Sequence, residues 1–420
     1  MVKIGVFADT HVGRSIPNVI SEYRRQDFRH AFSQAIDVFI KEDVEFVIHA
    51  GDLFERRSMT PSDSLFVKEE FQRLVDSLGG NVKIILVRGN HDGTAENSAL
   101  NYVEHPLAKY LKVLGEKTLQ GEPDLHEEGD LALIGFGYTP YVSARLAEVK
   151  DAIKEKFDKA KASHRVFLAH MFVEGQEVPP NIPEYQVAPF ELIKDLGANL
   201  IIAGHYHKYL PLKEKEGLFL LTPGSTEAID LSDEGSFGVC ILNLDRGVNC
   251  NFIPLKPLHK IKNEVVDSKG AAEQPEWFIE KAVTAVNVFS EELKSEGGEG
   301  ILRIALRGIV DGNRLDLEAD IEGRIREVRK DKPQLLHVEI ANELSELRAG
   351  AVSVPEHTGR DEFLQEVFSI LGEKGMAQAL SLAEEVRMTL EEKASAQTGL
   401  LKESDRKPFV ERWLKILEAE

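Results

Sequence analysis

The feature that most constrains how this chain folds is a regular alternation of short apolar runs and helical patterns over its first 255 residues. The runs are rich in β-branched and aromatic residues and close with glycine or a polar residue, as buried strands do. They occupy residues 3–9, 45–51, 82–89, 131–137, 165–170 and 199–205. Between them, apolar residues recur at helical spacing, as in residues 25–43 and 61–80. Strands that alternate with helices predict an α/β domain with much parallel sheet.

The pattern changes after residue 216, where strand-like runs follow one another with only turns between them. These runs, residues 217–225, 235–245 and 247–255, are expected to be antiparallel and to complete a second sheet. Prolines near residue 257 then indicate a domain boundary. We therefore expect a first domain over residues 1–257, a smaller α+β domain over 258–348, a linker over 349–359 and a helical segment over 360–420. The amphipathic helices of that last segment would either pack on the rest of the chain or lay their apolar faces on a partner.

The composition, 42% hydrophobic and 29% charged, is typical of a soluble globular protein. No apolar run approaches the roughly 20 residues of a membrane span, and the N-terminus lacks a secretion-signal pattern, so we expect a cytoplasmic protein without a membrane segment. The two cysteines, Cys240 and Cys250, lie on the arms of a predicted hairpin and form no Cys-x-x-Cys pair. A zinc–thiolate site is therefore disfavoured.

Polar side chains follow five of the predicted strands at their carboxyl ends, the edge of an α/β sheet at which sites are built. Any one of them alone could be a buried structural residue or a turn residue. Together they offer imidazole, carboxylate and amide groups without a thiolate, a set that suits a pair of divalent ions such as manganese, iron or zinc. The seven candidate ligands are Asp9, His11, Asp52, Asn90, His170, His205 and His207. Two ions that share a bridging carboxylate form the clamp used in phosphoryl chemistry.

The last of these strands ends in "AGHYH". If the chain leaves the strand in an extended conformation, His205 and His207 face the same way and Tyr206 faces away. His49, by contrast, lies inside its strand, and we expect it to be a buried structural histidine.

The motifs "DTH", "GD", "GNHD", a single "H" and "GHYH", in this order, resemble the five motifs of the calcineurin-like metallophosphoesterase superfamily. The segments "DTHVG", "HAGDLFERRSMTP", "VRGNHD" and "GHYHK" followed by "TPGSTE" are similar to the Mre-eleven/SbcD family of DNA double-strand-break repair nucleases. The likeness covers the first domain well and extends more weakly to residues 258–348, which correspond to that family's capping domain. It implies an α/β/β/α sandwich of two sheets, a small α+β capping domain and a C-terminal helical segment.

The resemblance also implies roles for the candidate site residues. One ion would be held by Asp9, His11, Asp52 and His207, and the other by Asp52, Asn90, His170 and His205, with manganese as the expected metal. His91 would stabilise the transition state or act as the acid toward the leaving oxygen. Asp92 would orient His91 or a ligand, or would only stabilise the turn before Gly93. This chain departs from many relatives at Glu55, where they carry a histidine three residues after the bridging aspartate.

The implied activity is that of a manganese-dependent DNA nuclease, a 3′–5′ double-strand exonuclease and single-strand endonuclease that processes DNA ends. The family works as a homodimer with a coiled-coil ABC ATPase of the SbcC type, which would bind residues 360–420. The apolar faces of helices over residues 65–78 and 98–112 could supply the dimer face or could be buried within the fold. Basic residues beside the motifs could follow a DNA backbone, although each alone is also ordinary surface. They are Arg14, Arg24, Arg25, Arg56, Arg57, Arg88 and Lys208.

Other functions fit the same motifs less well. A phosphodiesterase for a small nucleotide would share "GNHD" and "GHYH" but would not need an extension of about 160 residues. A protein Ser/Thr phosphatase would show "GDxVDRG" and "GNHE", where this chain has "GDLFERR" and "GNHD". A metal-free scaffold of the same fold would be expected to have lost ligands, and all seven are present.

The net charge of −20 leads to a prediction about DNA binding. Because the phosphates of DNA repel an acidic protein, we expect the chain alone to bind DNA weakly and to lose that binding steeply as salt rises. Fluorescence anisotropy of a labelled duplex, titrated at several salt concentrations, measures both properties. Nanomolar affinity of the monomeric chain at physiological salt would contradict the prediction.

Overall fold

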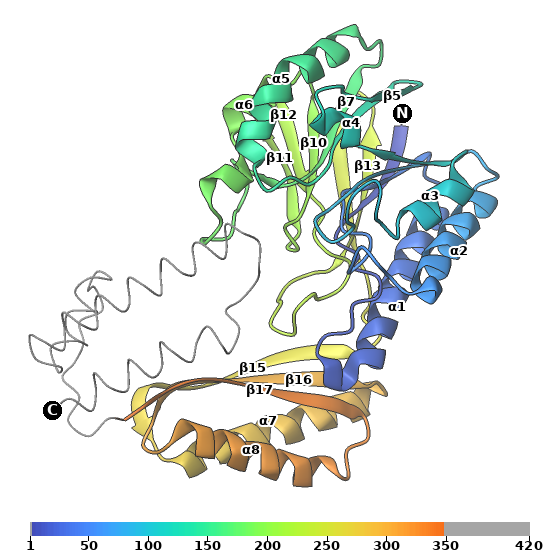
Figure 1. The fold of residues 1–420 in the computed structure, drawn as a ribbon. Helices are drawn as coiled ribbons and strands as arrows, with labels where there is room; N and C mark the ends of the chain where they lie inside the picture. The colour runs from blue at the N-terminus through green and yellow to red at the C-terminus, as the bar shows by residue number, and fades with distance from the viewer. Residues whose placement is uncertain (1, 348–420) are drawn as a thin grey trace, which may run out of the picture. The chain divides into compact units, whose positions relative to one another are not determined.

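Two six-stranded sheets lie face to face in the computed structural model, which describes residues 2–347 (Figure 1). The first sheet has the order β14-β13-β1-β2-β3-β4 and the second the order β11-β12-β10-β7-β6-β5. The first contains β1 (Val2–Phe7), β2 (Phe46–His49), β3 (Lys83–Val87), β4 (Leu111–Leu114), β13 (Gly238–Leu244) and β14 (Val248–Pro254). The second contains β5 (Leu125–Glu128), β6 (Leu131–Phe136), β7 (His164–His170), β10 (Leu200–Gly204), β11 (Leu210–Lys215) and β12 (Leu218–Thr222). The linker and helical segment predicted for residues 349–420 lie outside the described residues.

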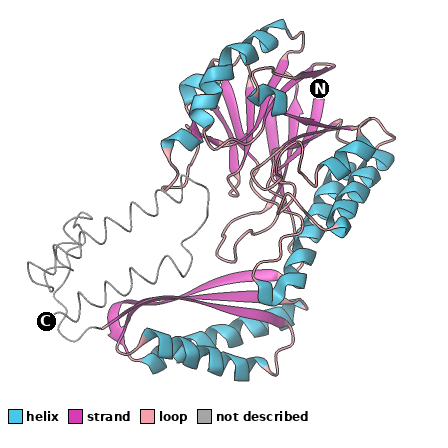
Figure 2. Cartoon of the chain, viewed as in Figure 1, coloured by secondary structure: helices cyan, strands magenta, loops and turns pink. Residues whose placement is uncertain are grey.

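Hydrophobic layers hold together the sheets and the helices, which Figure 2 distinguishes by colour. The middle layer joins Ile48 and Val87 of the first sheet to Leu168 and Ile202 of the second. The outer face of the first sheet packs on α1 (Ser21–Lys41), α2 (Pro61–Ser77) and α3 (Asn101–Leu107), and that of the second on α5 (Val142–Lys159) and α6 (Phe190–Lys194). Short elements complete this part: α4 (Glu116–Leu119), β8 (Phe172–Val173) and β9 (Val187–Ala188). This α/β/β/α arrangement confirms the predicted fold class.

Parallel pairing brings several strand ends to one edge. In the first sheet β1, β2, β3 and β4 run parallel, and in the second β6, β7 and β10 do so. The carboxyl ends of parallel neighbours lie at the same edge of a sheet, so the loops that follow them are neighbours in space. The loops that carry the predicted ligands follow parallel strands in both the first and the second sheet.

The three strands expected to complete one antiparallel sheet are divided between the two sheets instead. β12 pairs in parallel with β10 and antiparallel with β11 in the second sheet. The β13–β14 hairpin joins the first sheet, where β13 pairs antiparallel with β1. The prediction was wrong because short turns and apolar alternation do not specify which sheet edge a strand joins. β13 is buried on both faces, which fits its place beside β1 beneath α1.

The region after residue 257 has a sheet and core of its own. It runs β15 (Lys260–Glu273), α7 (Pro275–Glu296), β16 (Gly300–Val310), α8 (Arg314–Arg329) and β17 (Leu335–Glu346). All three strands are parallel, since each helix returns the chain to the start of the next strand. Side chains of both helices, such as Phe289 and Ile321, share a core with Leu302 and Ile304 of β16. The domain boundary near residue 257 stays a prediction. None of the helices in the described part combines the length and apolar character of a transmembrane segment.

A buried ion cluster joins α1 to the segments on either side of the β13–β14 hairpin. Arg24 is 0% exposed and donates hydrogen bonds to Asp27, at 2.7 Å, and to the carbonyl of Ala228. His259 Nδ1 lies 2.6 Å from the other carboxylate oxygen of Asp27. Glu227 is also buried, 3.8 Å from Arg24. The prediction that Arg24 follows a DNA backbone is therefore wrong, because its guanidinium group is enclosed and already paired.

The buried carboxyl group of Glu227 should make the stability of the fold depend on pH. Burial raises its pKa from 4.5 to about 7, although attraction to Arg24 opposes the shift. The folded chain thus holds this proton more tightly than the unfolded chain, so its stabilising effect is complete below about pH 4.5 and is lost as pH rises through about 7. The Glu227→Gln variant has no such proton to lose. We expect wild type to lose about 2 kcal/mol relative to Glu227→Gln between about pH 5 and 8.

Denaturant unfolding at the two pH values measures this difference. Glu322→Gln, an exposed change on α8, is the matched control and should follow wild type. If the free energies of unfolding of wild type and Glu227→Gln changed equally with pH, burial would not raise the pKa of Glu227.

Candidate metal centre

All seven predicted ligands come together where strands of the two sheets end. Asp9 and His11 follow β1, Asp52 follows β2, and Asn90 follows β3. In the second sheet, His170 ends β7, and His205 and His207 follow β10. Three sets of side chains offer ligand atoms within 4.8 Å of one another: Asp9, His11 and His207; His11, Asp52 and His91; and Asp52, His170 and His205. Asp52 is common to two sets, in the position of a bridging ligand.

The backbone at these loops is left-handed at four of the ligands. Asp9, His11, Asp52 and His205 have φ of 49°, 40°, 56° and 85°. Such values are uncommon for residues other than glycine and cost about 1–3 kcal/mol each, and they persist where surrounding contacts hold them. The expected extended exit at "AGHYH" is therefore wrong for His205. The left-handed turn separates the two histidines.

His205 and His207 consequently face different partners. The ring centroid of His205 lies 4.8 Å from that of His170, and the ring centroid of His207 lies 5.2 Å from that of His11. Two aromatic side chains that the sequence reading did not select also flank His205. Phe172 lies 4.5 Å and Tyr138 5.5 Å from it, centroid to centroid. Tyr138 follows β6, so the rule that selected the other strand ends would have found it.

Hydrogen bonds fix the tautomers of two candidate ligands, His170 and His11. His170 Nδ1 lies 2.8 Å from the carbonyl oxygen of Ala50, which can only accept, so this nitrogen donates. In the neutral ring, Nε2 then presents a lone pair to Asn90 Oδ1 at 3.1 Å and to Asp52 Oδ2 at 3.3 Å. Three acceptors that face one another suit a cation between them.

His11 shows the same arrangement. Its Nδ1 lies 3.1 Å from the carboxylate of Glu55, whereas its buried Nε2 has no hydrogen-bond partner among the described residues. Nε2 lies 3.8 Å from Asp52 Oδ2. A buried nitrogen lone pair without a partner, beside carboxylates, is a feature that a divalent ion would satisfy.

The electrostatics of the centre also favour bound positive charge. Asp9 and Asp52 are 0% and 1% exposed. Burial raises the pKa of Asp9 to about 7, and repulsion from Asp52 adds to the shift. Burial by itself would lower the pKa of His170, but attraction to Asp52 raises it to about 9. A metal ion at this place would compete with that proton, since ligation needs the free imidazole nitrogen.

Asp92 ties two ligand loops together through backbone hydrogen bonds. Its carboxylate accepts the N–H of Gly89 at 2.9 Å, of Phe54 at 3.0 Å and of Leu53 at 3.3 Å. The loop after β3 is thereby held on the loop after β2. His91 is placed by other groups, because its N–H donates to Asp52 Oδ1 at 2.8 Å and its Nδ1 donates to the carbonyl of Glu55 at 2.8 Å. His49 is fully buried, with Nε2 3.0 Å from Thr10 Oγ1, as expected of a structural residue.

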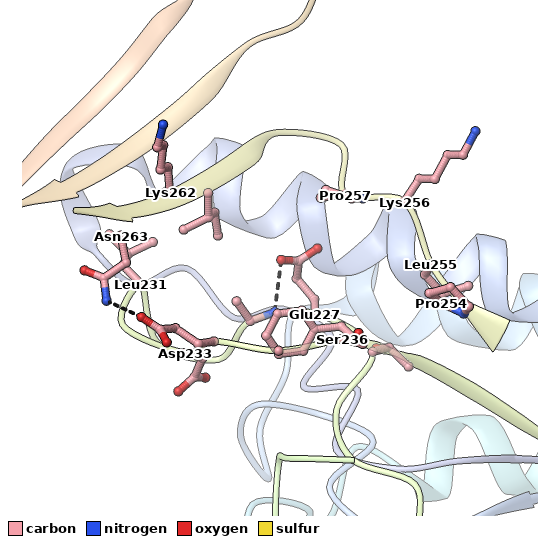
Figure 3. Close-up of a pocket in the computed structure, with 16 residues that line it drawn as sticks. Glu227, Leu231, Asp233, Ser236, Pro254, Leu255, Lys256, Pro257, Lys262 and Asn263 are labelled. Atoms are coloured by element: carbon pink, nitrogen blue, oxygen red, sulfur yellow. Dashed lines mark hydrogen bonds between the residues drawn. The ribbon is translucent and has the colours of Figure 1, made fainter. Parts of the chain in front are cut away.

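Two cavities lie near this region. One, of about 650 Å³, adjoins His205 and His207 and has aromatic walls that include Phe172 and Phe237. The other, of about 490 Å³, lies between the loop of residues 226–237 and residues 254–263 (Figure 3). Of the described residues that line the second cavity, none is a predicted ligand. Only the first cavity therefore gives a substrate room beside the metal centre.

The basic residues chosen as DNA contacts differ in their exposure. Arg56 and Arg57 are exposed, as is Lys208, which pairs with Glu177 at 2.8 Å. Arg25 is partly exposed beside Glu22, and Arg14 is largely occupied by hydrogen bonds to Glu55 and Ile229. Arg88 is only 4% exposed and donates to Asn101 at 2.9 Å. Like Arg24, Arg88 is therefore removed from the set of possible contacts, because burial keeps it from a backbone phosphate.

Comparison with known proteins gives one family match. Residues 2–209 match the calcineurin-like phosphoesterase family. Curated relatives include a DNA double-strand break repair protein Mre11 from Sulfurisphaera tokodaii, 25% identical over 53% of this chain and 53% of that protein. The protein of the same name from Methanosarcina mazei is 28% identical over 58% of this chain and 36% of its own length. The chain thus spans about half the length, or less, of these relatives.

Among solved structures, a dimetal phosphatase from Danio rerio is similar at a TM-score of 0.38. Its sequence is 12% identical, and the match covers 60% of this chain and 95% of the phosphatase.

The close approach of Gly89 to Asp52 generates a prediction. A Cβ at Gly89 would overlap the carboxylate and the backbone nitrogen of Asp52. Such overpacking costs about 1–3 kcal/mol and would displace Asp52 from its position between the two ligand sets. We expect Gly89→Ala to weaken divalent-metal binding roughly tenfold or more, measured by isothermal titration calorimetry with manganese as the probe.

Gly137→Ala is the matched control, because a Cβ there meets its nearest neighbours at the ordinary distances of 3.5 and 3.7 Å. Its metal affinity should equal that of wild type. Unchanged binding by Gly89→Ala would mean that Asp52 does not hold metal.

Proposed function

The chain carries a domain of the calcineurin-like phosphoesterase family, matched over residues 2–209, and from this premise we propose that the chain is a metal-dependent nuclease that cleaves phosphodiester bonds in DNA. The observation that carries the proposal is that the seven candidate ligand side chains come together from five strand ends, with Asp52 common to two of the three groups that could hold an ion. The curated relatives named as DNA double-strand break repair proteins support DNA as the substrate.

Two divalent ions, with manganese as the first candidate, would be held by the two ligand sets. The first set is Asp9, His11, Asp52 and His207, and the second is Asp52, Asn90, His170 and His205. When bound, the ions supply charge neutralisation at the phosphoryl oxygens and make a water molecule nucleophilic. The side chains of the protein then have to hold the phosphodiester and deliver a proton to the leaving oxygen.

His91 is the candidate for that proton transfer. Its Nδ1 is engaged by the carbonyl of Glu55 and its backbone N–H by Asp52, so Nε2 is the ring nitrogen left for substrate. The ring is half-buried and lies 4.8 Å from the ring of His11, centroid to centroid. When doubly protonated, it can donate from Nε2 to the leaving oxygen and return to the neutral form with Nδ1–H still bonded. Arg56, Arg57 and Lys208 are exposed and are the first candidates for contact with the DNA backbone, ahead of Arg25 and Arg14, which have neighbouring partners.

The finer features of the family belong to the same proposal. They are 3′–5′ double-strand exonuclease and single-strand endonuclease activity, a homodimer, and a coiled-coil ABC ATPase partner bound through residues 360–420. Affinity for DNA would then come mainly from dimerisation and from the partner, since the net charge of this chain is −20.

Cleavage assays test the function directly. With manganese, the purified chain should degrade linear duplex DNA and cut single strands, chelation by EDTA should stop both reactions, and added manganese should restore them. Cleavage of a small cyclic nucleotide without cleavage of DNA would favour the alternative phosphodiesterase. Failure to bind manganese in calorimetry would favour a metal-free scaffold.

For His91→Ala we expect kcat to fall by about 10²–10⁴-fold while the chain still binds two manganese ions, because the lost group moves a proton and is not a predicted ligand. Rates on linear duplex DNA and calorimetric stoichiometry measure the two quantities. The exposed Asp151→Asn on α5 is the control and should cleave like wild type. Full activity of His91→Ala would remove His91 from the mechanism.

A further inference from the structure

A chain of hydrogen bonds runs from the ligand His11 outward through two charged side chains. His11 Nδ1 lies 3.1 Å from Oε2 of Glu55. Arg14 Nη1 donates to Oε1 of the same carboxylate at 2.9 Å, and Arg14 Nε donates to the carbonyl of Ile229 at 2.6 Å. Glu55 is only 6% exposed. The carboxylate therefore has both of its oxygens engaged, one by the metal-ligand histidine and one by the arginine.

This arrangement determines which nitrogen of His11 is free. A carboxylate that accepts from Nδ1 holds the proton on that atom and leaves the lone pair on Nε2, the nitrogen that has no partner among the described residues. Such a partner also makes the imidazole a stronger electron donor toward a metal. Burial by itself would raise the pKa of Glu55, but the hydrogen bonds from His11 and Arg14 hold it below its usual range.

Glu55 is fixed in place by its own backbone. Its N–H donates to the carbonyl of Val12 at 3.1 Å, and Val12 and Phe54 form a parallel β-bridge. The segment that follows Asp52 is thereby held against the segment that carries His11. The carbonyl of Glu55 binds His91, so this residue serves His91 through its backbone and His11 through its side chain. A change of the side chain leaves the contact with His91 available.

We propose that Glu55 is a positioning residue for one of the two metal sites, with Arg14 as the group that balances and orients its carboxylate. The inference rests on the proposed function. Glu55 acts through His11, and therefore on the set of Asp9, His11 and His207. The set of Asp52, His170 and His205 has its own orienting contact, from His170 to the carbonyl of Ala50, and does not depend on Glu55. The consequence is a site-selective effect on metal binding.

Manganese binding to the full chain tests the proposal by isothermal titration calorimetry. We expect wild type to bind two ions, and Glu55→Ala to bind one of them about 10–100-fold more weakly while the other keeps its affinity. Glu55→Gln keeps the shape and one acceptor oxygen but loses the charge, so it should weaken the same site by a smaller factor. Arg14→Gln should also affect that site alone. Cobalt(II) absorption spectra give a second readout, since a change at His11 alters the spectrum of one ion only.

Glu177→Gln is the matched control, because this carboxylate lies near the centre but pairs with Lys208 and Tyr206. Both metal sites of the Glu177→Gln variant should bind manganese with the affinities of wild type. Melting temperatures in EDTA show that each variant folds, and Glu55→Gln carries the test if Glu55→Ala does not.

Two results would overturn the inference: wild-type affinities at both sites in the Glu55→Gln and Glu55→Ala variants, or equal weakening of both sites, which would indicate a general structural role. Failure of wild type itself to bind manganese would instead reject the proposed function, and the inference with it.

Discussion

The carboxylate of Asp52 is the group on which the rest of the candidate site depends. Its Oδ1 accepts the backbone N–H of His91, and its Oδ2 lies 3.3 Å from His170 Nε2 and 3.8 Å from His11 Nε2. His91 and His11 come from loops of the first sheet, whereas His170 ends a strand of the second. One buried carboxylate is thus shared by three strand ends across the space between the sheets. An unpaired charge at this depth would be costly, so it calls for positive charge beside it.

The sandwich core makes this arrangement possible. The left-handed conformations at Asp9, His11, Asp52 and His205 cost free energy, which the surrounding contacts have to offset. The apolar layer between the sheets fixes the strands that enter these turns, and Asp92 fixes two of the loops relative to each other. Rigid strands with strained exits place several ligands within a few ångströms, as pre-organised sites require.

Charge in this protein is arranged in layers around the centre. The carboxylates and histidines of the centre would face the metal, and behind them the buried Glu55 pairs with the partly buried Arg14, which in turn donates to a backbone carbonyl. A second buried cluster, around Arg24 and Asp27, lies where α1 meets the segment that leads into β15. Several arginines of this acidic chain are therefore used inside the fold, where they pair with carboxylates. Fewer basic side chains are therefore left to contact DNA than the number of arginines and lysines beside the sequence motifs suggests.

By itself, the sequence pattern determined the alternation of strands and helices and the strand ends that carry candidate ligands, whereas the sandwich class was implied by the resemblance of its motifs to a known family. The alternation and the strand ends follow from apolar periodicity and from residues close together along the chain, such as Asn90, which follows β3 after Arg88 and Gly89. Only the tertiary structure decided that β12 and the β13–β14 hairpin join different sheets, that Arg88 is buried, and that Glu55 contacts His11. Each of those outcomes depends on a partner far away in the chain, as Arg24 depends on Ala228, 204 positions later. Local pattern records which face of an element is buried, but the identity of its distant neighbours is settled only when all the elements pack together.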